Sequence, residues 1–213
     1  QATEVSRSQR QCGGTFVIMT LNAGKKRFRE TAAIQRKQAV ATASPNSPAI
    51  IADHIVRQFG NHATRGVVSG YLAIGDELDV EPALQGLRQT GMQLALPVVI
   101  AAGQALIFRQ WQPGTDLEPG SLRTRHPTPD NPELAPDMLL VPMLAFDDQG
   151  YRMGWGGGFY DRTLAGLRSR KSVLAIGVAY AGQRVDKVPR DHHDARLDWI
   201  ATEAGMYEVP QAT

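Results

Sequence analysis

One stretch constrains the fold of this chain more than any other: residues 139–164, which read LLVPMLAFDDQGYRMGWGGGFYDRTL. An apolar run at its start, Met138–Val141, predicts a buried strand. A polar turn leads to Gly154-Trp155-Gly156-Gly157-Gly158, and a helix-compatible run opens at about Phe159. Four glycines in five residues do not suit a regular element, because each loses backbone entropy there. The stretch therefore predicts a strand, a tightly turning glycine loop and a helix in succession.

This glycine loop is a candidate anion site. At the N-terminus of a helix, unpaired N–H groups and the helix dipole favour a bound anion. Arg152 before the glycines offers a cation that can pair with phosphate, and Asp161 after them offers an oxygen ligand for a metal ion. The spacing matches neither a P-loop nor the dinucleotide pattern G-x-G-x-x-G. From these residues alone, a glycine-rich surface turn stays open as the alternative to a phosphate site.

Apolar runs alternate with helix-forming segments along the rest of the chain. The expected strands span residues 66–74, 93–100, 105–111, 138–141 and 172–180, with a last short one within 197–207. The expected helices span residues 25–40, 48–59, a segment from about 80 or 81, and 160–169. Ser47 is expected to cap the second helix, with Pro48 at its first position. The alternation predicts a single-domain, three-layer α/β/α fold with a mostly parallel mixed sheet, antiparallel around residues 105–111.

The predicted domain organisation is simple. Residues 1–24 are expected to be a poorly ordered extension, 25–209 the domain and 210–213 a tail. Met19 is a candidate natural start, with residues 1–18 as an upstream extension. Residues 112–136 are expected to be loop, because their prolines and glycines forbid long helices. A single cysteine, Cys12, excludes an intrachain disulfide, and no apolar run approaches about 20 residues, so a cytoplasmic location is expected.

The segment from Val141 to Arg162 resembles the signature of 5-formyltetrahydrofolate cyclo-ligases, also called 5,10-methenyltetrahydrofolate synthetases. Its centre, Arg152–Asp161, reads RMGWGGGFYD. Trp155 and Phe159 stand where that family usually has Tyr, and Met143-Leu144 replaces a pair that more often contains Gly. None of these replacements removes a polar group that the chemistry would need. The resemblance covers residues of about 25–209 and is strongest at 141–162.

The resemblance implies an enzyme that cyclises 5-formyltetrahydrofolate to 5,10-methenyltetrahydrofolate, with release of ADP and phosphate. The implied reaction depends on ATP as co-substrate and on Mg²⁺ as cofactor, and it passes through a phosphorylated formyl group, an imino-phosphate. The implied partners are these small molecules, with neither nucleic acid nor membrane, and the chain is expected to be a monomer.

The resemblance also assigns roles to residues. Lys25 and Arg29 match a Lys-x-x-x-Arg element that contacts ATP, and Glu77 matches a glutamate that meets the folate. The residues implied to bind ATP are Lys25, Lys26, Arg27, Phe28, Arg29, Arg152, Met153, Gly154, Trp155, Gly156, Gly157, Gly158, Phe159 and Tyr160. Those implied to bind folate are Leu72, Glu77, Trp155, Gly156, Gly157, Gly158 and Phe159.

Catalytic and metal roles follow from the same resemblance. Arg152, Lys25 and Gly157 are expected to act in catalysis, the two cations by neutralising the triphosphate and the glycine as a backbone donor. Asp161 and Asp194 are expected to hold Mg²⁺; the second lies in a family pattern that runs from a glutamine through a proline to an aspartate.

Two other function classes stay open. One is a sugar-phosphate isomerase or transferase that uses the glycine loop for a phosphate ester. The other is a non-catalytic RNA-binding module that uses residues 25–37, although a formal net charge of +2 and aromatics that are not interleaved with the basic residues argue against it. His192-His193-Asp194 does not have zinc-site spacing. The sequence assigns no role to these two histidines or to His126.

Overall fold

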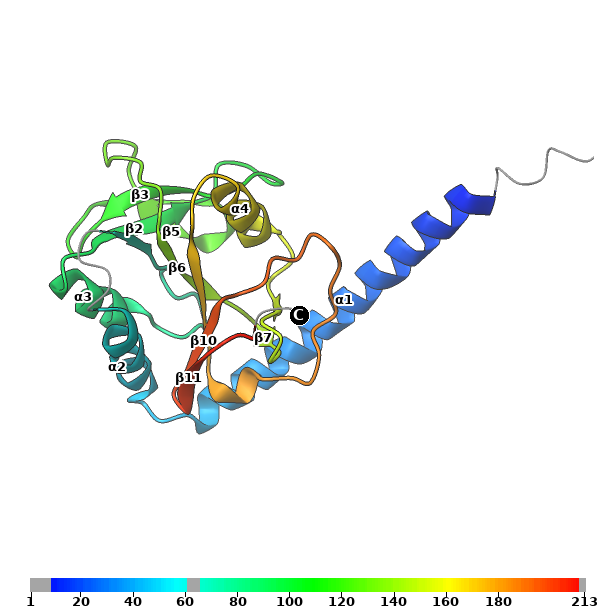
Figure 1. Cartoon of the computed structure of the whole chain (residues 1–213), viewed down its shortest axis with the longest axis horizontal. Helices are drawn as coiled ribbons and strands as arrows, with labels where there is room; N and C mark the ends of the chain where they lie inside the picture. Colours follow the sequence, from blue (N-terminus) through cyan, green and yellow to red (C-terminus); the bar gives the residue numbers. More distant parts are fainter. Residues whose placement is uncertain (1–8, 61–65, 211–213) are drawn as a thin grey trace, which may run out of the picture.

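The computed structural model describes residues 9–60 and 66–210, with side chains from residue 23 onward. Its centre is a seven-stranded sheet with the order β11-β10-β9-β6-β1-β2-β3 (Figure 1). Five neighbouring strands are parallel, namely β10 (Trp199–Thr202), β9 (Leu174–Val178), β6 (Met138–Pro142), β1 (Val67–Ser69) and β2 (Gln93–Val98). The edge strands β11 (Gly205–Glu208) and β3 (Ile107–Trp111) are antiparallel to their neighbours. The predicted α/β class with a mostly parallel mixed sheet is confirmed.

Helices lie on both sides of this sheet. In Figure 1, α2 (Ser47–Phe59) and α3 (Glu81–Gln89) lie on one side and α4 (Phe159–Arg168) lies on the other. The long helix α1 (Gln9–Thr42) runs past the sheet beside the short η2 turn (Ala181–Gln183) and projects beyond it at the N-terminal end.

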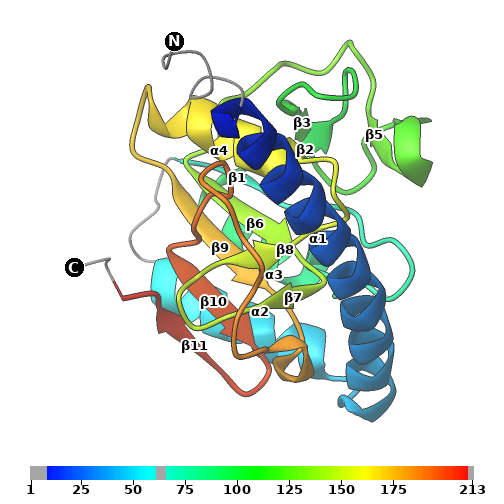
Figure 2. The same cartoon turned by 90° about the vertical axis from the view of Figure 1, so that its right-hand side faces the viewer.

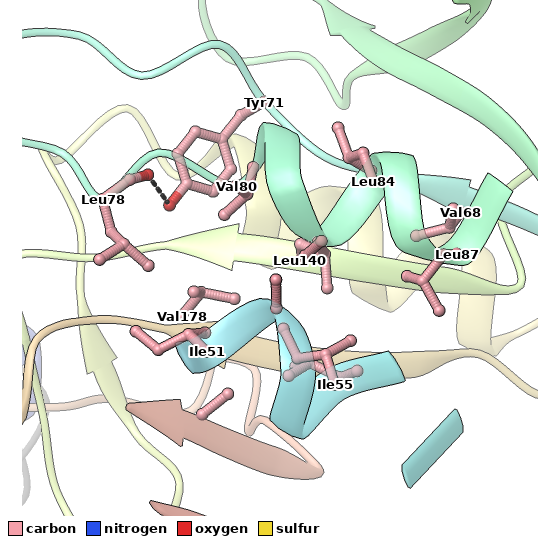
Figure 3. Packing of buried hydrophobic residues seen from close by; sticks show 14 of the residues in the cluster. Ile51, Ile55, Val68, Tyr71, Leu78, Val80, Leu84, Leu87, Leu140 and Val178 are labelled. Carbon is pink, nitrogen blue, oxygen red and sulfur yellow. Dashed lines mark hydrogen bonds between the residues drawn. The ribbon is translucent and has the colours of Figure 1, made fainter. Parts of the chain in front are cut away.

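Two hydrophobic clusters hold these layers together, and β6 contributes to both. Met138 and Leu140 face the cluster of α2 and α3, whereas Leu139 and Val141 face the cluster of α4. Because successive side chains of a strand point to opposite faces, a continuous apolar run is what a strand covered on both sides requires. Figure 3 shows Leu140 among side chains of α2 and α3, including Ile55.

The first strand is shorter than expected. The prediction placed a strand over residues 66–74, but β1 ends at Ser69. The chain then turns away, and the hydroxyl of the buried Tyr71 donates to the carbonyl of Leu78 at 2.9 Å (Figure 3). The apolar residues after Ser69 therefore serve a packed loop, and β2 likewise ends at Val98, two residues before the expected end.

The segment expected to be loop, residues 112–136, contains a small hairpin. It pairs β4 (Leu117–Pro119) with β5 (Arg125–Pro127) around the η1 turn (Ser121–Arg123). Arg109 of β3 fixes it, since Nη1 donates to the carbonyl of Pro127 at 2.8 Å and to Glu118 at 3.3 Å. The last expected strand is also a hairpin, formed by β10 and β11.

Two helix starts differ from the prediction. The first helix was expected from residue 25, but α1 begins at Gln9. Asn46, not Ser47, occupies the N-cap of α2, so Ser47 lies inside the helix and is buried. The division into an extension, a domain of residues 25–209 and a tail stays a prediction; residues 1–8 and 211–213 lie outside the described residues. Within the described ranges, none of the helices combines the length and hydropathy needed to cross a membrane.

Candidate active site

The candidate site forms where segments that follow parallel strands meet the long helix. After β6, the chain makes the small ladder of β7 (Ala145–Phe146) and β8 (Arg152–Met153) and then enters the glycine loop, residues 154–158. Helix α1 runs alongside this ladder (Figure 2), and Ala32 packs against Leu144, Ala145 and Met153. Ligands of open α/β sheets commonly bind beyond the carboxyl ends of the strands. The fold thus brings the basic segment of α1 and the glycine-rich segment 154–158 together.

The glycine loop needs glycine at two positions because of its backbone conformation. Gly156 has a φ of 99° and Gly158 a φ of 63°, in the region that side chains with a Cβ rarely adopt. Gly158 is the N-cap of α4. The side chain of Arg162, one turn into α4, donates to the carbonyl of Gly157. The loop is therefore held at the start of the helix, as the sequence predicted.

Arg29 joins α1 to this loop. Its Nε donates to the carbonyl of Gly154 at 3.1 Å. A Cβ built on Gly156 would lie 3.0 Å from the Cζ of Arg29. A side chain at position 156 would therefore have to displace the guanidinium of Arg29.

Gly156→Ala is expected to lower the turnover rate of the enzyme by about tenfold and its free energy of unfolding by about 1–3 kcal/mol. The reason is that Ala must adopt a positive φ and displace Arg29. Gly154→Ala is the matched comparison for stability, since a Cβ there meets no atom of the described residues within 4 Å. Thermal unfolding of both variants, with turnover of the first, checks this. Equal unfolding temperatures for the two variants would show that an alanine at position 156 causes no measurable backbone strain.

Lys25 is the centre of an ion cluster. Its Nζ lies 2.9 Å from Oδ2 of Asp191 and 2.5 Å from Oδ2 of Asp194, and the residue is only 7% exposed. Burial lowers the pKa of Lys25, but the hydrogen bonds to Asp194 and Asp191 outweigh it, so this pKa lies above its ordinary value. The hydrogen bond from Lys25 lowers the pKa of Asp191. Lys25 and Asp191 are therefore both charged at neutral pH.

A second ion pair adjoins the first. Nη2 of the buried Arg152 lies 2.8 Å from Oδ1 of Asp161, and its Nη1 donates to the carbonyl of Ala195 at 2.7 Å. The amide of Ala195 in turn donates to Asp161 at 3.1 Å. Ala195 directly follows Asp194 in the sequence. Its contact with Asp161 therefore places Asp161 close to the segment that contains Asp194, and these are the two carboxylates predicted to hold a metal.

Glu77 approaches the glycine loop from the loop after β1. Its Oε2 accepts from the amide of Ile74 at 3.0 Å, and its Oε1 accepts from Nε1 of Trp155 at 3.4 Å. Burial raises the pKa of Tyr160, and the negative charge of Glu77 adds to the shift. Trp155 is 65% exposed, so apolar surface of this residue lies open beside a carboxylate.

The structure brings together Lys25, Arg29, Arg152, Asp161 and Asp194 with the glycine loop and Glu77. Other predicted residues lie differently. Lys26 and Arg27 are exposed on α1. Phe28, Met153, Leu72, Phe159 and Tyr160 pack in or against the hydrophobic clusters. Their predicted ligand contacts stay predictions.

Two polar residues of the candidate site, Asp191 and Arg36, were missed by the sequence analysis. Asp191 lies beside Asp194, and only the folded chain shows that both reach Lys25. Arg36 is buried on α1 and lies 3.9 Å from Glu77. A signal for Arg36 exists: at about 100° per residue, positions 25, 29 and 36 fall within roughly 40° on one face of a helix.

The side chains of Asp161 and Asp194 carry oxygen donors of the type that Mg²⁺ takes. Mg²⁺ takes oxygen ligands and is commonly held by one or two carboxylates together with phosphates and waters. Asp161 and Asp194 each present an oxygen to a cation in this cluster. In the part of the chain that the structure describes, no group of three or more His, Cys, Asp or Glu side chains is arranged to hold a metal. The metal role of Asp161 and Asp194 therefore stays a prediction.

Known proteins resemble this chain in sequence and in fold. The sequence model of the 5-formyltetrahydrofolate cyclo-ligase family matches residues 22–203. The 5-formyltetrahydrofolate cyclo-ligase of Escherichia coli (strain K12) is 34% identical over 147 residues, covering 66% of this chain and 80% of the relative. That of Mycolicibacterium smegmatis is 32% identical over 167 residues, covering 69% and 84%. The solution structure of Aquifex aeolicus 5,10-methenyltetrahydrofolate synthetase superposes with a TM-score of 0.66 at 23% identity, covering 89% and 94% of the two chains.

Proposed function

The chain belongs to the 5-formyltetrahydrofolate cyclo-ligase family, and we propose that it converts 5-formyltetrahydrofolate to 5,10-methenyltetrahydrofolate with consumption of ATP. The observation that carries the proposal is the meeting of three segments at the glycine loop. Helix α1 supplies cations, the segment around Asp194 supplies carboxylates, and the loop after β1 supplies Glu77 beside an exposed indole.

The proposed reaction needs activation of a poor leaving group. The formyl oxygen attacks the γ-phosphorus of ATP and ADP leaves, which gives the imino-phosphate. N10 of the folate then attacks the activated carbon, loses its proton, and inorganic phosphate departs. Phosphoryl transfer asks a protein mainly for positioning and for neutralisation of charge. This agrees with a site built from fixed cations and backbone donors.

In this proposal each group has one task. Lys25, Arg29 and Arg152 neutralise the triphosphate, and the amides of residues 154–158, Gly157 among them, donate to phosphate oxygens at the start of α4. Asp161 and Asp194 would hold Mg²⁺, which supplies charge neutralisation at the β- and γ-phosphates when bound. The fixed positions of Lys25 and Arg152 support these roles, because ion pairs with carboxylates hold both buried cations in place.

Glu77 and Trp155 form the proposed folate side. The carboxylate accepts from N–H groups of the ligand, and the indole offers its face to a flat ring. Their contact at 3.4 Å supports a shared surface. Lys25 is only 7% exposed, so it is not part of the surface basic patch that an RNA-binding role for residues 25–37 would use. We propose that the protein acts as a monomer in the cytoplasm.

An absorbance assay tests the function. Purified protein, 5-formyltetrahydrofolate, ATP and Mg²⁺ are mixed, and formation of the methenyl chromophore is followed. A rise that requires both ATP and Mg²⁺ is expected. If the rise occurs without ATP, the proposed activation step is wrong, and if no rise occurs under any condition, the function is wrong.

Glu77→Gln is expected to raise the KM for 5-formyltetrahydrofolate by about 10- to 100-fold and to leave the KM for ATP unchanged. The reason is the loss of hydrogen bonds to a charged group, which are worth about 1.5–3 kcal/mol. Asp79→Asn is the control, because Asp79 is an exposed carboxylate in the same segment that accepts from the amide of Glu81. Steady-state kinetics in each substrate decides it, and an unchanged folate KM in Glu77→Gln would remove Glu77 from the folate site.

A further inference from the structure

Arg36 is a buried charge, and two of its three side-chain nitrogens have no hydrogen-bond partner among the described residues. The residue is 4% exposed. Its Nε and Nη1 are shielded from solvent, and neither has a hydrogen-bond partner among the described residues. Buried guanidinium groups are costly unless they are paired and bonded. Packing alone does not explain why a guanidinium is buried without these hydrogen bonds.

Its surroundings point to one. Nη1 of Arg36 lies 3.9 Å from Oε1 of Glu77, and the Cζ of Arg36 lies 5.2 Å from the centre of the Trp155 ring. The same Oε1 accepts from Nε1 of Trp155 at 3.4 Å. One guanidinium therefore lies within ion-pair distance of Glu77 and also over the face of the Trp155 indole.

The position of Arg36 on α1 places it on the same helix face as two other residues of the site. Lys25 contacts Asp194, Arg29 contacts the glycine loop and Arg36 contacts Glu77, all from one face of the helix. The planar guanidinium suits Arg36, because it stacks on an aromatic ring while it faces a carboxylate, and an ammonium group does this less well.

We propose that Arg36 is a positioning residue for folate: it holds Glu77 and Trp155 together as one surface. This rests on the proposed function for the identity of the ligand, although the coupling of the three side chains does not. Helix α1 then supports both halves of the site, the nucleotide side through Lys25 and Arg29 and the folate side through Arg36.

The first test needs no substrate. The unfolding equilibrium is measured in denaturant for the wild type, Arg36→Met, Glu77→Gln and the double variant. If Arg36 acts on Glu77, the two effects do not add, and the double variant departs from their product by about fivefold or more in the unfolding constant. Additive effects would reduce Arg36 to an ordinary packing residue and overturn the proposal. Lys37→Met is the control, because Lys37 is the neighbouring, exposed cation of α1.

The second test uses turnover. Arg36→Met is expected to raise the KM for 5-formyltetrahydrofolate by about tenfold or more, with the KM for ATP unchanged, and to add little in the Glu77→Gln background. Arg36→Lys should recover part of the loss, and it replaces Arg36→Met in both tests if the latter does not fold. An active wild type with an unchanged folate KM in the Arg36 variants would overturn the proposal and leave the function standing. An inactive wild type would instead refute the function, and the unfolding cycle alone would then decide the coupling.

Discussion

Asp161→Asn is expected to reduce kcat/KM for Mg·ATP by about 100-fold, because it removes a charge that the proposed site uses twice. Asp161 neutralises Arg152 at 2.8 Å and is one of the two proposed ligands of Mg²⁺. Loss of one partner of a buried, hydrogen-bonded charge pair costs about 2–5 kcal/mol, of which 2.7 corresponds to about a hundredfold. Asn keeps the size of the side chain, so the change isolates the charge.

The measurement is turnover as a function of free Mg²⁺ at fixed ATP, together with the Kd of Mg·ATP from calorimetry. The variant should need more Mg²⁺ and bind Mg·ATP more weakly. Asp148→Asn is the matched control, because Asp148 is an exposed carboxylate bonded to Arg184 and Tyr207. Near-normal turnover of Asp161→Asn at limiting Mg²⁺ would exclude Asp161 as a metal ligand.

The parts of the fold that the sequence predicted are those that local patterns determine. The apolar run at Met138–Val141 predicts a strand covered on both faces, and its four residues divide between the two clusters. Glycines at 156 and 158 predict a turn before a helix, and both have a positive φ. In each case the information lies within a few residues, so no distant contact is needed.

The parts that failed depend on distant contacts. The strand expected over residues 66–74 ends at Ser69, and Tyr71 beyond it bonds to the carbonyl of Leu78. Apolar content alone does not separate a strand from such a packed loop. The hairpin within residues 112–136 depends on Arg109 from a strand earlier in the chain. Periodicity within a window reports neither of these contacts.

The site divides in the same way. Arg152, the glycine loop and Asp161 are close in sequence, and their grouping was predicted. The contact of Lys25 with Asp191 joins residues 166 positions apart, and Arg36 meets Glu77 and Trp155 only after folding. The resemblance to a family pointed to Lys25 and Asp194 as separate residues for ATP and Mg²⁺, but it predicted no contact between them. For Arg36 no motif residue led to the contact.

Leu140→Ala is expected to lower the free energy of unfolding by about 2–5 kcal/mol, the largest stability effect among these variants. Leu140 is fully buried in the central strand β6, within the cluster that also contains Ile55 and Leu87 (Figure 3). Removing its isobutyl group forfeits the transfer free energy and leaves a cavity that the surrounding side chains of α2 and α3 close only in part. For a chain of this size the melting temperature should fall by roughly 4–20 °C.

Ile34→Ala is the control, because Ile34 is 60% exposed on α1 and should change stability by no more than about 0.5 kcal/mol. Denaturant unfolding of both variants measures the difference. Because Leu140 faces α2 and α3 and not the glycine loop, turnover of folded Leu140→Ala, measured well below its melting temperature, should equal that of the wild type. A large loss of turnover in that folded variant would mean that the cluster of α2 and α3 around Leu140 determines the geometry of the site. Stability and catalysis would then not be separable at this strand, and the kinetic effects of Asp161 and Glu77 variants would have to be corrected for it.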